Sequence, residues 1–221
     1  MGDTARILLY GLIAAASPTT LLAVLVVLLS KRGRANGLAF AAGFLFGYVA
    51  AFLTAFFVGS TISEQHHGSV RSYAELVLGV VLIAVGWRGR RSPDPTEAGR
   101  SSGMEALFAK LEHVRPTVSF SLGVALGVGT KRLIITAVAA GTVAFAGLSD
   151  AEESGLGVLY VVVGGLTVWL PVGIYLIAGK RADDWIASAK AWLTTNQQKV
   201  VFYSSTAFGV AIIADALVQL M

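Results

Sequence analysis

The sequence predicts an all-α integral membrane protein with six transmembrane helices, arranged as two inverted three-helix repeats. Of its 221 residues, 55% are hydrophobic and 14% are charged, whereas about a quarter of the residues in a soluble domain are charged. Six apolar segments are near or above the roughly 20 residues that a helix needs to cross a bilayer. They cover residues 7–29, 36–58, 70–87, 117–147, 155–178 and 199–220.

A polar stretch over residues 88–116 separates the first three apolar segments from the last three. We therefore expect a first repeat over residues 1–87, a cytoplasmic linker over 88–116 and a second repeat over 117–221. Because three crossings is an odd number, the second repeat would enter the membrane from the opposite side, as in many secondary transporters. Trp185 and Trp192 lie on an apolar face between the last two segments and predict a short amphipathic helix there, either at the cytoplasmic interface or as an ordinary connecting helix.

The connecting loops alternate in charge along the chain. Loops one and five are rich in cations, whereas loop four has three acidic residues and no cation. The residues concerned are Lys31, Arg32 and Arg34, then Lys180, Arg181 and Lys190, and finally Asp150, Glu152 and Glu153. The positive-inside rule then predicts a multi-pass protein of the inner (plasma) membrane with both termini outside.

Two adjacent cations, Lys131 and Arg132, lie in the middle of the fourth apolar segment. A charge at the centre of a membrane helix costs about 2.5–3.5 kcal/mol on insertion scales. Such a cost is tolerated where the charge faces a polar cavity, a partner or a ligand. Arginine and lysine favour anions, so the pair predicts a site for an anionic or polar head near the bilayer midplane.

The first and fourth segments are interrupted at corresponding positions. Proline breaks the first segment at Pro18, and two glycines, Gly127 and Gly129, weaken the fourth just before Lys131. Matching interruptions of this kind are the best sequence indication of a transporter's binding site. The predicted substrate-binding residues are Lys131, Arg132, Thr130, Ser17, Pro18 and Thr19, with Pro18, Gly127 and Gly129 as helix breaks or hinges.

Structural alternatives exist for each of these residues. Lys131 and Arg132 could form a buried ion pair with Asp215, the one acid well inside the sixth segment; Asp215 could instead be a proton site. Residues 117–130 could also form a re-entrant segment rather than part of a span. The glycine pairs Gly43 and Gly47, and Gly123 and Gly127, predict close helix packing within one protomer or across a homodimer.

Three stretches of the first half resemble a known family. They are Ala16-Ser17-Pro18-Thr19-Thr20-Leu21, Ser30-Lys31-Arg32-Gly33-Arg34-Ala35-Asn36-Gly37 and Ala42-Gly43-Phe44-Leu45-Phe46-Gly47. They are similar to the GAP family of actinobacterial glycopeptidolipid- and sulfolipid-addressing proteins, in the LysE transporter superfamily. The family usually has Asn-Pro-Lys in the second half, where this chain has Gly129-Thr130-Lys131. The resemblance implies a LysE-like fold and export, or help with export, of lipidic envelope molecules.

Several classes of function are not indicated. The chain has no cysteine, no nucleotide-binding Walker loop and no acid–base or nucleophile pair, so we expect no enzyme, no cofactor and no metal site. His66 and His67 with Glu64 fit a solvated loop, and the cationic loops fit membrane orientation rather than nucleic-acid binding.

The expected function is a transporter or translocation factor for amphipathic cell-envelope lipids or lipid-linked glycans. Its expected partners are membrane lipids, a glycolipid substrate and either a second copy or an envelope-biosynthesis complex. The alternatives are a small-molecule, amino-acid-like exporter and a non-transporting accessory protein of a glycolipid export complex.

Overall fold

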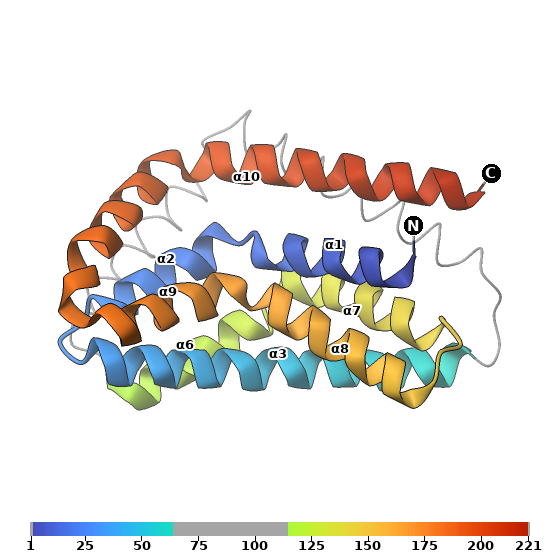
Figure 1. Cartoon of the computed structure of the whole chain (residues 1–221), viewed down its shortest axis with the longest axis horizontal. Helices are drawn as coiled ribbons and strands as arrows, with labels where there is room; N and C mark the ends of the chain where they lie inside the picture. Colours follow the sequence, from blue (N-terminus) through green and yellow to red (C-terminus); the bar gives the residue numbers. More distant parts are fainter. Residues whose placement is uncertain (1, 64–114, 221) are drawn as a thin grey trace.

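The computed structural model of the chain describes residues 2–63 and 115–220, without the side chains of residues 58–63, 130–131, 211–212 and 214–220. Every regular element within these residues is a helix, which confirms the all-α prediction. The elements are α1 (Asp3–Ala15), α2 (Pro18–Leu28), α3 (Gly33–Ser63), α6 (Pro116–Gly127), α7 (Thr130–Ala144), α8 (Asp150–Gly164), α9 (Leu166–Ala178), the 3₁₀ helix η1 (Gly179–Ala182) and α10 (Asp183–Leu220) (Figure 1).

Most of the apolar segments are bent pairs of helices rather than single straight helices. α1 and α2 meet at 58°, α6 and α7 at 59°, and α8 and α9 at 63°. Within the described residues, one helix, Gly33–Phe57, is long and apolar enough to span a membrane alone, and up to four spans result if each bent pair counts as one. The predicted span over residues 70–87 lies outside the described residues, so six spans remain a prediction.

The first two breaks lie where the sequence predicts them. Pro18 begins α2 and Ser17 before it is extended, with φ −122° and ψ 94°. Gly129 precedes α7 with φ −53° and ψ 141°. The third break, at Gly165, is absent from the sequence prediction, which treated residues 155–178 as one span. Two adjacent glycines, Gly164 and Gly165, explain it because glycine has a low helix propensity.

The predicted amphipathic segment before the sixth span is helical, but it is not divided from that span. The structure has one continuous helix, α10, from Asp183 to Leu220. The polar residues at the predicted junction bond within the helix: the hydroxyls of Thr194 and Thr195 and the amide of Asn196 each donate to a carbonyl four residues earlier. No glycine or proline occurs between Asp183 and Phe208 to interrupt the helix.

The two glycine pairs pack α3 directly against α6. A methyl group at Gly47 would lie 2.7 Å from the carbonyl oxygen of Val124, and one at Gly127 would lie 2.6 Å from that of Phe44. Gly43 and Gly123 are closer still to the backbone of the facing helix. The predicted close packing is therefore confirmed, and it occurs within one protomer. Gly127 closes α6 as a packing residue, and the bend follows it at Val128 and Gly129.

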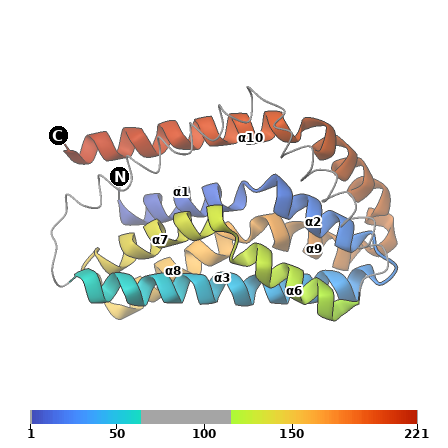
Figure 2. The same cartoon turned by 180° about the vertical axis from the view of Figure 1, so that it is seen from behind.

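Each half of the chain packs its broken first helix against the second helix of the other half. α3 lies along α6 and α7, while α8 and α9 lie along α1 and α2. α10 lies across α2 and α1 (Figures 1 and 2). Inverted repeats remain a prediction, because the third segment of the first repeat lies outside the described residues.

The cationic loops one and five lie at one end of the bundle and the acidic loop at the other. The α2–α3 connection and η1 are at one end, while both termini and the α7–α8 connection are at the opposite end (Figure 1). Lys31 and Arg32 belong to the first of these connections, and Lys180 and Arg181 to η1. The first turn of α8, beside the other end, contains Asp150, Glu152 and Glu153.

The loop that follows α2 is built from the residues of the second family-like stretch. The Asn36 side chain is fully buried and donates from Nδ2 to Ser30 Oγ at 2.8 Å, and Ser30 Oγ donates to the Val27 carbonyl oxygen at 2.6 Å. A methyl group at Gly33 would lie 2.7 Å from the Tyr175 hydroxyl oxygen. This stretch therefore forms a compact turn that holds α9 against the start of α3.

Candidate functional site

The three helix breaks lie at about the same level, near the middle of the bundle's long axis (Figures 1 and 2). Two hydrogen bonds join them. Arg132 Nη1, in the first turn of α7, donates to the carbonyl oxygen of Gly164 at 3.1 Å, and Thr167 Oγ1, at the start of α9, donates to the carbonyl oxygen of Ala15. The α8–α9 break therefore contacts both the start of α7 and the end of α1.

Arg132 is buried, with 5% of its surface exposed, and no carboxylate pairs with it among the described side chains. Its guanidinium carbon lies 4.7 Å from the centre of the Phe44 ring and 5.0 Å from that of Tyr48. The Gly164 carbonyl that accepts its hydrogen bond ends α8, where the helix dipole is negative. Among the described residues, two aromatic faces and one carbonyl surround the guanidinium where a buried cation normally has an anion.

One guanidinium nitrogen and one neighbouring hydroxyl make no hydrogen bond of good geometry within the described part of the chain. They are Arg132 Nη2 and the fully buried hydroxyl of Tyr48. The neighbouring Tyr160 is satisfied, because its hydroxyl lies 2.9 Å from that of Thr136. A buried unpaired donor costs about 1–3 kcal/mol, so two in one place need an explanation. We call Phe44, Tyr48, Arg132, Thr136 and Tyr160 the arginine cluster.

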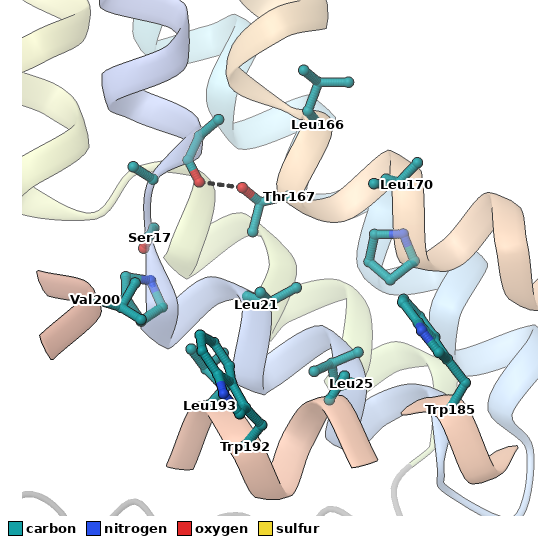
Figure 3. Close-up of a pocket in the computed structure, with 15 residues that line it drawn as sticks. Ser17, Leu21, Leu25, Leu166, Thr167, Leu170, Trp185, Trp192, Leu193 and Val200 are labelled. Carbon is teal, nitrogen blue, oxygen red and sulfur yellow. Dashed lines mark hydrogen bonds between the residues drawn. The ribbon is translucent and has the colours of Figure 1, made fainter. Parts of the chain in front are cut away.

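An apolar pocket of about 500 Å³ lies between α2, α9 and α10, beside the α1–α2 and α8–α9 breaks (Figure 3). Its lining residues are Ala15, Ala16, Ser17, Pro18, Leu21, Leu25, Leu166, Thr167, Leu170, Pro171, Trp185, Ala189, Trp192, Leu193 and Val200. None of them is charged. We call this cavity the α10 pocket.

The predicted site residues are divided between these two places. Ser17 and Pro18 line the α10 pocket, whereas Thr19 is half-buried and does not. Arg132 belongs to the arginine cluster, and Gly129 precedes α7. The α8–α9 break contacts both, because the Gly164 carbonyl accepts from Arg132 and Thr167 lines the α10 pocket.

Three predicted site residues have side chains outside the described part of the structure. Thr130 and Lys131 are the first two residues of α7, and Asp215 is on α10. A pairing of Asp215 with Lys131 or Arg132 therefore remains a prediction.

The sequence analysis predicted neither the aromatic rings around Arg132 nor the third helix break, at Gly165. Tyr48 and Tyr160 each place a phenol inside an apolar segment, and a buried phenol normally requires a hydrogen-bond partner. The adjacent glycines Gly164 and Gly165 resemble the interruption at Gly127 and Gly129. These two signals were available, but nothing local indicates that Tyr48, Tyr160 and Gly164 surround Arg132.

The fold and the site define a helical membrane protein whose apolar helices are broken midway, with a buried cation and an apolar pocket beside the breaks. The chain belongs to the family described as Sap, sulfolipid-1-addressing protein, whose model matches residues 7–218. This confirms the sequence resemblance, while membership of the LysE superfamily remains a prediction. No curated protein and no solved structure matches the chain. The family name and the apolar helices together indicate a lipid-related role in a membrane.

Proposed function

We propose that this protein moves an amphipathic cell-envelope lipid across the plasma membrane, or presents it for movement, by binding its anionic head at Arg132 and Lys131. The family description supports a sulfated or otherwise anionic glycolipid as the substrate class. The proposed role is non-enzymatic and requires no cofactor.

The observation that supports this proposal most is the buried guanidinium without a carboxylate partner among the described side chains. Leaving a buried charge unpaired costs several kcal/mol, and an apolar side chain of similar volume would avoid that cost. A guanidinium with a free Nη2 is well suited to a sulfate, phosphate or carboxylate oxygen. Arg132 and Lys131 also lie in the first turn of α7, where the helix terminus favours an anion.

The broken helices support movement of the bound head. Helices that are interrupted midway and gathered at one level are typical of transporters with alternating access, in which one repeat rocks against the other. The reciprocal packing of α3 on α6 and α7, and of α8 and α9 on α1 and α2, is compatible with such a motion.

The proposal is tested by lipid movement in proteoliposomes. The probe is a sulfated glycolipid with a fluorescent acyl label, and its movement is followed by quenching with a membrane-impermeant reductant. We expect Arg132→Met and Lys131→Ala each to slow movement by about tenfold or more, because a hydrogen bond to a charged group contributes about 1.5–3 kcal/mol. The same lipid without its sulfate should move slowly in wild type and in both variants.

The matched control is Arg6→Met. Arg6 is also buried, with 8% of its surface exposed, but Asp3 pairs with it at 3.4 Å near the start of α1. We expect this variant to move the sulfated lipid at close to the wild-type rate. If Arg132→Met and Lys131→Ala are folded and both transport normally, the head-binding site is wrong. Transport of a labelled amino acid in place of the lipid would indicate a small-molecule exporter, and no movement at all would indicate an accessory protein.

A further inference from the structure

We infer that the α10 pocket binds one hydrocarbon chain of the lipid, separately from the site of its head. The inference rests on the proposed function for the identity of the lipid. The pocket itself is argued from its lining, its shape and the helix break that forms it.

The lining is suited to hydrocarbon because it offers almost no free polar group. No lining residue is charged. Both hydroxyls of the lining already have partners, since Ser17 Oγ lies 2.9 Å from Thr20 Oγ1 and Thr167 Oγ1 donates to the Ala15 carbonyl. The other polar side-chain atoms of the lining are the indole nitrogens of Trp185 and Trp192. A polar ligand would therefore lose its hydrogen bonds to water without replacement, which is costly, whereas a hydrocarbon chain would not.

Two backbone carbonyls at the helix break beside the pocket have hydrogen-bond partners within the protein. A helix that ends inside a protein leaves carbonyl oxygens without partners. Here the Ala15 carbonyl accepts from Thr167 and from the Ser17 N–H, while the Ala16 N–H donates to the Leu12 carbonyl. Beside these paired groups, the small side chains of Ala15 and Ala16 and the ring of Pro18 line the pocket.

One face of α10 covers the pocket. Trp185, Ala189, Trp192 and Leu193 recur at helical spacing and all line it. The two indoles are 51% and 60% exposed, so each has one surface toward the pocket and another toward the surroundings. Tryptophan side chains that are partly buried and partly exposed are typical of a membrane interface, which adjoins the lipid hydrocarbon chains.

The size and access of the pocket fit a single chain. Its volume of about 500 Å³ lies within the 300–1,000 Å³ of typical small-molecule sites. It is partly open, so a chain can enter between the helices rather than being enclosed during folding. It also touches the α8–α9 break whose Gly164 carbonyl holds Arg132, which brings chain and head sites to the same break.

The test is photolabelling of the full-length chain in phosphatidylcholine nanodiscs. The probe is a fatty acid with a diazirine near its methyl end, and labelled residues are located by mass spectrometry. We expect saturable labelling of α2, α9 and α10 around the pocket at low probe fraction, and competition by unlabelled fatty acid. Labelling that rises in proportion to the probe and is spread over exposed residues such as Phe46 and Ile177 would mean ordinary bilayer contact, and would overturn the inference.

A matched pair of substitutions on α10 sharpens the test. Ala189 lines the pocket, while Ala187, two residues earlier, is exposed and does not. We expect Ala189→Phe to lower the saturable labelling about tenfold, by filling the cavity, and Ala187→Phe to leave it unchanged. Leu170→Trp, on the exposed side of α9, is a second filling variant should Ala189→Phe not fold. Equal labelling in a folded filling variant and in Ala187→Phe would contradict the inference.

The result separates this inference from the proposed function. Arg132→Met and Lys131→Ala should keep the pocket labelling while losing lipid movement. Saturable pocket labelling without any lipid movement by wild type would leave the chain site standing and refute transport. Normal lipid movement without saturable labelling would refute the chain site and leave transport standing.

Discussion

At the scale of single residues, the arginine cluster differs from an ordinary buried network in being only half satisfied. The Tyr160 hydroxyl pairs with Thr136, but the Tyr48 hydroxyl and Arg132 Nη2 make no hydrogen bond of good geometry within the described part of the chain. The rings of Tyr48 and Tyr160 are nevertheless in contact, with centres 5.3 Å apart. Two phenols in the same surroundings therefore have different hydrogen-bond states, and this difference can be measured.

We expect Tyr160→Phe to destabilise the protein by about 1–3 kcal/mol, because it leaves the buried Thr136 hydroxyl unpaired. Tyr48→Phe should cost less, because the hydroxyl that it removes makes no hydrogen bond of good geometry among the described residues. Thermal unfolding of both variants in detergent gives the comparison. Equal losses from the two substitutions would mean that the Tyr48 hydroxyl is bonded after all.

At the scale of elements, α3 acts as the straight axis on which the broken helices are packed. Glycine permits this where side chains would keep the helices apart. Backbone atoms of α6 lie within 3 Å of the position that a methyl group would take at Gly43 and Gly47, and backbone atoms of α3 do the same at Gly123. The bend after α6 therefore starts from a helix that is packed closely against α3.

We expect Gly123→Ala to destabilise the protein by about 1–3 kcal/mol, since the new methyl group would lie against the Phe40 carbonyl and 2.8 Å from the Phe44 nitrogen. Gly155→Ala is the control. Nothing lies within 4 Å of a methyl group at Gly155, an exposed position inside α8, so alanine there should stabilise by about 0.4–1 kcal/mol. Thermal unfolding checks both, and a neutral Gly123→Ala would contradict the α3–α6 packing.

At the scale of the whole molecule, charge divides the bundle along its length. The cationic α2–α3 connection and η1 lie at one end, and the termini and the acidic start of α8 at the other (Figure 1). This separation is the one that the positive-inside rule predicts for cytoplasmic and external ends. The continuous helix α10 leads from the cationic end toward the end that holds both termini.

The orientation can be measured directly because the chain has no cysteine. We expect Asp150→Cys to react with a membrane-impermeant thiol reagent applied to intact cells, and Lys31→Cys and Arg181→Cys to react only after the membrane is permeabilised. The lipid-movement assay above confirms that each variant is folded. Reaction of all three from the same side would contradict the proposed topology.

The sequence by itself determined the features that depend on local composition. Hydropathy predicted the apolar helices, Pro18 and Gly129 predicted two of the breaks, and the glycine pairs predicted close packing, because helix propensity and residue size act within a few residues. The family was also recognisable from short stretches around Pro18 and Gly33, before the match over residues 7–218. These statements need no knowledge of which helices are neighbours.

Only the tertiary structure decided what surrounds the buried cation. Its partners come from α3 and α8, distant in sequence: the Gly164 carbonyl and the rings of Phe44 and Tyr48. The site predicted as one is divided between the arginine cluster and the α10 pocket, and α10 continues where a junction was expected. The physical reason is that the surroundings of a side chain depend on long-range packing. Local helix signals do not indicate which distant carbonyl group or aromatic ring will contact it.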